Sequence, residues 1–63
     1  MTKFKVGDKV RVINAEGSGH TDGDIGEVVA IDPPGPTQMF EVDVAGFEQA
    51  HYAEDIEYAE VSE

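Results

Sequence analysis

Glycine- and proline-rich segments break this 63-residue chain into short pieces, and these breaks limit the folds that it can adopt. Residues 14–24 contain three glycines and no large apolar side chain, and residues 32–36 contain three prolines. Proline cannot continue a strand ladder, and a polar, glycine-rich stretch is typical of a loop that contributes nothing to a core. The pieces between the breaks contain alternating apolar residues. They predict short strands and an all-β fold.

Alternation along the chain predicts four strands before its last segment, at residues 9–13, 25–31, 39–44 and 47–52. The third strand has the clearest pattern, because Phe40 and Val42 point to one of its faces while Glu41 and Asp43 point to the other. Gly26 lies inside the second strand, and a glycine at such a position usually marks a bulge or a close backbone approach.

The final segment allows two interpretations. Tyr52, Ile56 and Ala59 fall at the i, i+4 and i+7 positions of a short amphipathic helix. A lone helix of this length is marginal without a packing face, so we favour a single helical turn at residues 53–55 and a closing strand at residues 56–61. The expected core, enclosed by a closed sheet, consists of Val10, Val12, Val29, Phe40, Val42 and Ile56.

Two stretches carry a resemblance to a known family. Residues 6–13 read Val-Gly-Asp-Lys-Val-Arg-Val-Ile and residues 26–31 read Gly-Glu-Val-Val-Ala-Ile, and together they resemble the opening strands of KOW-type domains. Residues 52–57 look like the short turn and last strand that close many small SH3-like barrels of bacteria and phages. The resemblance implies one domain over residues 1–63, folded as a five-stranded SH3-like barrel. Such barrels host many unrelated functions.

KOW-type domains typically contact RNA or the transcription and translation machinery, and the resemblance would place that contact around Gly26. This chain departs from the pattern, because the loop before Gly26 carries Glu16, Asp22 and Asp24 and no Lys or Arg. Phosphate contact through that loop is not expected.

Charge is distributed unevenly along the chain. The net charge is −10, yet all four cations, Lys3, Lys5, Lys9 and Arg11, lie in the first eleven residues, and thirteen of the fourteen carboxylates follow them. Such a field repels nucleic-acid backbones from most of the surface and attracts a basic protein. Simple solubility and adaptation to high salt remain alternative explanations of the same charge.

Catalytic and metal-binding residues are sparse. The chain has no Cys, and its two histidines are His20 and His51. His20 lies near Asp22 and Asp24, so a metal site is conceivable, but a solvated turn is the preferred interpretation. His51 lacks a convincing nucleophile and orienting partner, so we expect a surface or cross-strand histidine. The chain is therefore expected to be no enzyme and to hold no metal or cofactor.

The carboxylates suggest two kinds of interaction. Glu41 and Asp43 lie about 6.8 Å apart on one strand face, a spacing of the same order as that of successive phosphates. Such a row can imitate nucleic acid and occupy the groove of a DNA- or RNA-binding protein, or it can be an ordinary outward face. Further acids that would extend the row are Glu48, Glu54, Glu57 and Glu60.

Three aromatic residues near the fourth strand are candidates for an interface. Phe47, His51 and Tyr52 lie at or near strand ends, although a core position is the preferred expectation for Phe47.

We expect a non-catalytic protein-interaction module with a basic protein partner. The alternatives are a nucleic-acid mimic, and a nucleic-acid binder that uses the basic amino-terminal edge. The amino terminus has no continuous apolar stretch, so a cytoplasmic monomer without membrane contact is expected.

Overall fold

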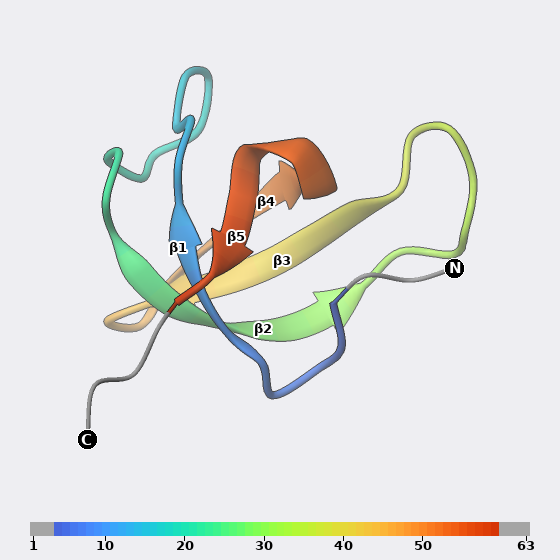
Figure 1. Cartoon of the computed structure of the whole chain (residues 1–63), viewed down its shortest axis with the longest axis horizontal. Coiled ribbons are helices and arrows are strands. Elements are labelled where there is room, and N and C mark those ends of the chain that lie inside the picture. The colour runs from blue at the N-terminus through green and yellow to red at the C-terminus, as the bar shows by residue number, and fades with distance from the viewer. Residues whose placement is uncertain (1–3, 60–63) are drawn as a thin grey trace.

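The computed structural model describes residues 4–59, and the all-β fold is confirmed there (Figure 1). The second, third and fourth strands and the helical turn begin and end at the predicted residues. In chain order the elements are β1 (Lys9–Val12), β2 (Ile25–Ile31), β3 (Met39–Val44), β4 (Phe47–Tyr52), the 3₁₀ turn η1 (Ala53–Asp55) and β5 (Ile56–Tyr58). The alternative of a helix over the final segment is wrong.

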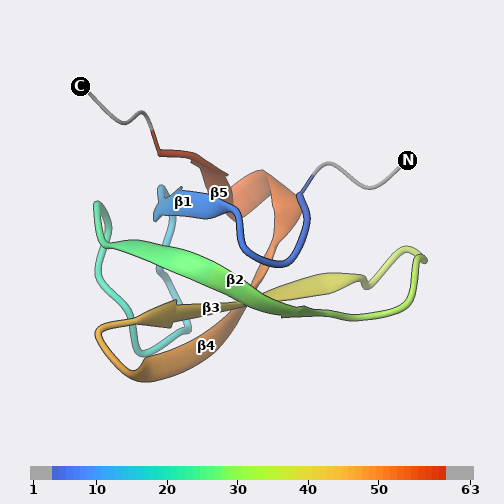
Figure 2. The same ribbon diagram turned by 90° about the horizontal axis from the view of Figure 1, so that it is seen from below.

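All five strands belong to one antiparallel sheet with the order β4-β3-β2-β1-β5. Seen from below, β1 and β5 lie over β3 and β4, and β2 runs between the two pairs (Figure 2). The sheet is therefore strongly curled. It is not closed, because β4 and β5 are its two edges and do not pair with each other within the described residues. The closed sheet that we expected is not observed.

The strand ends are set by hydrogen bonds to other elements. β1 ends at Val12 rather than Ile13, because the backbone N–H groups of Ile13 and Asn14 donate to the carbonyl of Asp55, at 2.9 and 3.2 Å. β5 ends at Tyr58. The predicted strand was longer, and it is wrong at Ala59, which lies outside the strand. Its last two residues, 60 and 61, lie outside the described range.

β3 and β4 form a tight hairpin. Val44 pairs with Phe47, so only Ala45 and Gly46 make the turn, and both have positive φ, +53° and +89°. Two successive positive φ values are the backbone requirement of a type I′ turn, whose twist matches that of the strands beside it. The predicted tight turn is confirmed.

The second strand places a different valine in the core than predicted. Val28 is fully buried, whereas Val29 is 36% exposed. Val28 pairs with Val42, and the register then shifts before Ala30, so that Val29 is the extra residue of a bulge. Side chains alternate along a strand, so an error of one position reverses the face. The assignment of Val29 to the core was wrong for this reason.

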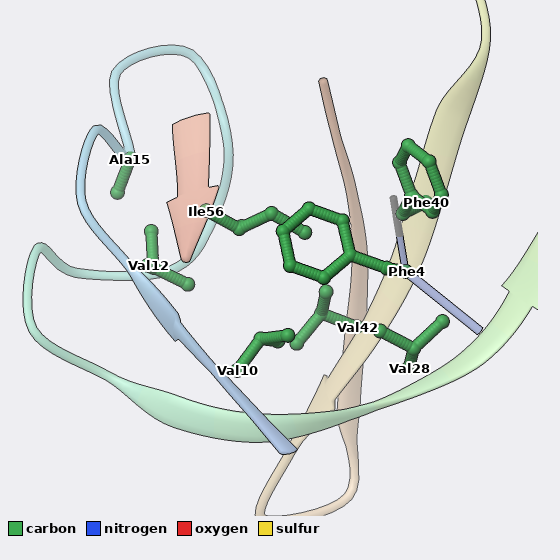
Figure 3. Close-up of a cluster of buried hydrophobic side chains, with 8 residues drawn as sticks. All are labelled: Phe4, Val10, Val12, Ala15, Val28, Phe40, Val42 and Ile56. Carbon is green, nitrogen blue, oxygen red and sulfur yellow. The ribbon is translucent and has the colours of Figure 1, made fainter. Parts of the chain in front are cut away.

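Eight apolar side chains form the core (Figure 3), namely Phe4, Val10, Val12, Ala15, Val28, Phe40, Val42 and Ile56. Phe4 precedes the first strand and was not expected there. Its ring packs edge-on against Phe40, with centroids 5.5 Å apart, and it lies 4.7 Å from the ring of Tyr58. Ala15 comes from the loop of residues 14–24, so that loop does contribute to the core, contrary to expectation.

Candidate functional site

Carboxylates line up across three neighbouring strands on the outer face of the sheet. Glu27 of β2 pairs with Asp43 of β3, and Asp43 pairs with Glu48 of β4. Directly opposite residues in an antiparallel sheet point to the same face, and Glu41 lies two residues from Asp43 on that face. We call Glu27, Glu41, Asp43 and Glu48 the acidic face. Three of the predicted binding residues are thus brought together.

The row of opposed carboxylates is unfavourable for folding on its own. Like charges directly opposite each other destabilise a strand pair, and here Asp43 has such a neighbour on both sides. Lys9 of β1 is the cation that continues the row, opposite Glu27. The acidic face therefore holds a local excess of negative charge that a cationic partner would relieve.

Glu57 does not extend this row. It lies on β5, opposite Arg11 of β1, and the two side chains form a salt bridge. Arg11 is one of the cations of the basic amino-terminal edge, so this salt bridge pairs a cation of that edge with a carboxylate. Of the other cations of that edge, Lys9 lies opposite Glu27, and Lys3 is outside the described residues.

The two histidines form a buried pair. His20 and His51 are 7% and 3% exposed, their rings stack with centroids 5.1 Å apart, and His20 Nδ1 lies 2.9 Å from His51 Nε2. His20 Nε2 lies 2.8 Å from the backbone carbonyl of Phe47. The solvated turn predicted at His20 is wrong, because that ring is buried against His51. His51 was expected to be a surface or a cross-strand histidine, and the cross-strand position is confirmed, because it lies on β4 opposite Phe40.

The hydrogen-bond geometry assigns the protons of the neutral pair. A carbonyl oxygen only accepts, so His20 Nε2 carries a hydrogen and donates it to Phe47. His20 Nδ1 is then an acceptor, and His51 Nε2 donates to it. The pKa of His51 is lowered, first by burial and then by the neighbouring His20, while Asp55 acts in the opposite direction.

The pair attaches the loop of residues 14–24 to β4. The backbone N–H of Gly19 donates to Gln49 Oε1 at 3.2 Å, and the Phe47 ring packs edge-on against His20 with centroids 5.3 Å apart. Phe47 is 50% exposed, so its predicted core position was wrong. Its ring packs against His20 instead.

The two aspartates that were considered beside His20 as metal ligands have other partners. Asp22 and Asp24 accept hydrogen bonds from the backbone N–H groups of Ala15 and Thr21, at 2.7 and 2.9 Å. No group of three or more His, Asp or Glu side chains that could hold a metal ion occurs within residues 4–59.

Two open cavities lie on either side of the end of β4. The larger, of about 380 Å³, lies between η1 and the loop of residues 32–38, and it brings together Tyr52 and Glu54 from the predicted binding set. The smaller, of about 210 Å³, extends between η1 and the loop of residues 14–24. Tyr52 and Glu54 were predicted as binding residues from the sequence, but the sequence did not indicate that they line one cavity together with the buried Phe40.

In the part of the chain that the structure describes, no helix is long and apolar enough to cross a membrane. Comparisons with protein-family models, with curated proteins and with solved structures found no match.

Proposed function

We propose that this chain is a non-catalytic protein-interaction module that docks through its acidic face onto a basic protein. The observation that supports the proposal most strongly is the register of Glu27, Asp43 and Glu48, which sets three carboxylates side by side on adjacent strands. Folding alone does not favour this arrangement. Binding of a cationic surface favours this arrangement, because the repulsion between the carboxylates is then offset by their attraction to the partner, and the same attraction accelerates association.

The proposal includes an SH3-like architecture and a cytoplasmic setting. The strand order, the strong curl and the single 3₁₀ turn before β5 support an SH3-like arrangement, as does the resemblance of residues 6–13 and 26–31 to KOW-type motifs. The acidic face offers a surface whose charge is complementary to that of a basic partner.

A second candidate function is nucleic-acid mimicry. Glu41 and Asp43 lie about 6.8 Å apart along β3, a spacing of the same order as that of successive phosphates, and Glu48 lies beside Asp43 on β4. The mimic would occupy the basic groove of a DNA- or RNA-binding protein. Direct nucleic-acid binding through the basic edge is the weakest candidate, since Arg11 is paired with Glu57.

The test uses basic peptides as probes. Affinity for arginine-rich and lysine-rich peptides is measured by fluorescence anisotropy at several salt concentrations, for the wild type and for the double variant Glu41→Gln/Asp43→Asn. The matched control is Glu16→Gln/Asp32→Asn, which removes the same charge from exposed loop positions. We expect weaker binding for the first variant alone, and a wild-type affinity that falls with salt.

The candidate functions give different results in companion titrations. A mimic displaces DNA or RNA from a basic binding protein, whereas a nucleic-acid binder itself takes up duplex or RNA with steep salt dependence. The proposed docking function is refuted if neither peptide binds the wild type, or if both double variants lose the same affinity.

A further inference from the structure

The larger cavity lies where the loop between β2 and β3, the turn η1 and the end of β4 meet. Pro36 and Gly35 belong to the loop between β2 and β3, Ala53 and Glu54 belong to η1, and Tyr52 is the last residue of β4. Its volume of about 380 Å³ is within the range of about 300 to 1,000 Å³ that is usual for binding pockets.

The loop side of the cavity is held in place by its own hydrogen bonds. Gln38 Nε2 donates to the carbonyl of Asp32 at 2.9 Å, and the backbone N–H of Gln38 donates to Gly35 at 3.2 Å. The N–H of Asp32 also donates to Met39 at 3.0 Å, and three prolines restrict the backbone between these bonds. A wall that is ordered before binding lowers the entropic cost of binding.

The chemistry of the lining favours a cation with a flat apolar surface. Phe40, 1% exposed, lines the cavity from the core, and Tyr52, 41% exposed, supplies an accessible aromatic ring. Glu54 is exposed and is the only charged residue of the lining. Aromatic faces attract cations, and a carboxylate beside them adds direct charge complementarity.

We infer that this cavity binds an arginine side chain presented by the basic protein partner. A guanidinium group stacks on an aromatic face and pairs with a carboxylate through two parallel hydrogen bonds, whereas a lysine ammonium does neither as well. Tyr52 is the stacking surface and Glu54 is the carboxylate. This inference rests on the proposed function, to which it adds a specificity site separate from the acidic face.

The test compares two basic peptides of equal length and charge, one with arginine and one with lysine at every cationic position. Binding to the wild type is compared with binding to Glu54→Gln, Tyr52→Leu and Tyr52→Phe. We expect Glu54→Gln and Tyr52→Leu to weaken arginine-peptide binding about threefold to thirtyfold, which is the effect of losing one cation–π or paired contact. Tyr52→Phe, which keeps the ring, retains the affinity.

Two controls make the result specific. Glu16→Gln removes one exposed loop charge outside the cavity and should have a smaller effect than Glu54→Gln. Circular dichroism checks that Tyr52→Leu keeps its β structure. Changes in the amide chemical shifts of the wild type on addition of the arginine peptide show where the peptide binds, and the largest changes are expected at Gln38, Tyr52 and Ala53.

The outcomes separate this inference from the proposed function. The cavity is not the arginine site if Glu54→Gln lowers the affinity for the arginine peptide no more than Glu16→Gln does, and if Tyr52→Leu binds that peptide like the wild type. In that case a loss of binding in Glu41→Gln/Asp43→Asn would still support docking through the acidic face. Equal wild-type affinity for the two peptides would overturn the choice of arginine. Binding of neither peptide would refute the proposed function itself.

Discussion

Acidification should destabilise this protein through the His20–His51 pair. In the neutral pair His51 Nε2 donates to His20 Nδ1, and both rings are buried. A positive charge on His51 would lie in this buried site beside the His20 ring, so the charged form of His51 is disfavoured in the folded state. With ring centroids 5.1 Å apart, two positive rings repel each other by about 3 kcal/mol at an effective dielectric constant of about 20.

The direction of the pH effect follows from the lowered pKa of His51. The folded state binds fewer protons than the unfolded state once the pH falls below the ordinary histidine pKa of 6.5. The contribution to stability is therefore fully present above pH 6.5 and is lost as the pH falls through the lowered pKa of the folded state. A deficit of one proton removes about 1.4 kcal/mol per pH unit. The loss grows as the pH falls below 6.5 and levels off below the folded pKa of His51. Even about 1–2 kcal/mol is a large fraction of the stability of a small domain.

The assay is urea unfolding, followed by circular dichroism at a series of pH values from 7.5 to 5. The control variant is His20→Gln/His51→Gln, whose amides can replace the hydrogen bonds but do not titrate. The free energy of unfolding of the wild type should fall with decreasing pH, and that of the control should change much less. A wild-type curve that is flat, or that runs parallel to the control, would refute the assignment of this effect to the histidine pair.

Three further predictions concern packing and charge. Gly26→Ala should destabilise the fold by about 1–3 kcal/mol or more in urea unfolding, because its Cβ would lie 2.3 Å from the backbone oxygen of Asp43; an unchanged midpoint would contradict this contact. Phe4→Ala should lower the free energy of unfolding by about 3–5 kcal/mol, since the ring is fully buried. Phe47→Ala removes a half-exposed ring and should lower it less, and urea unfolding of both variants checks the order. Glu48→Lys should raise stability by about 0.2–1 kcal/mol at low salt by placing a cation opposite Asp43, and it should weaken basic-peptide binding; a gain that does not shrink at high salt would argue against a charge effect.

Local sequence was sufficient to predict most of the strands. The bounds of β2 and β3 follow from alternation and from the breaks beside them, because a glycine- or proline-rich segment ends a strand whatever its surroundings. The end of β4 and the turn η1 lie in a segment without Gly or Pro, and they were predicted because a lone helix of this length is marginal. Local sequence also predicts that three carboxylates lie close together, namely Glu41, Asp43 and Glu48, because the two-residue turn at Ala45 and Gly46 sets the register of the hairpin.

Which side chains of β2 face the core could not be predicted in the same way. Val28 and Val29 are adjacent and equally apolar, and the choice between them depends on the bulge that the pairing of β2 with β3 introduces. Gly26 indicated an irregularity, and its lack of a side chain does permit the close approach of Asp43. The bulge itself lies three residues further on.

Residues distant in sequence determined the rest of the candidate site. His20 and His51 are 31 positions apart, and neither local pattern indicates burial; they meet because the loop of residues 14–24 folds over the end of β4. The cavity likewise combines residues of the β2–β3 loop with residues of η1. The sequence alone determined where the strands lie and how charge is distributed. Only the tertiary structure decided which side chains are enclosed, because burial depends on the curl of the whole sheet and on the loops that cover it.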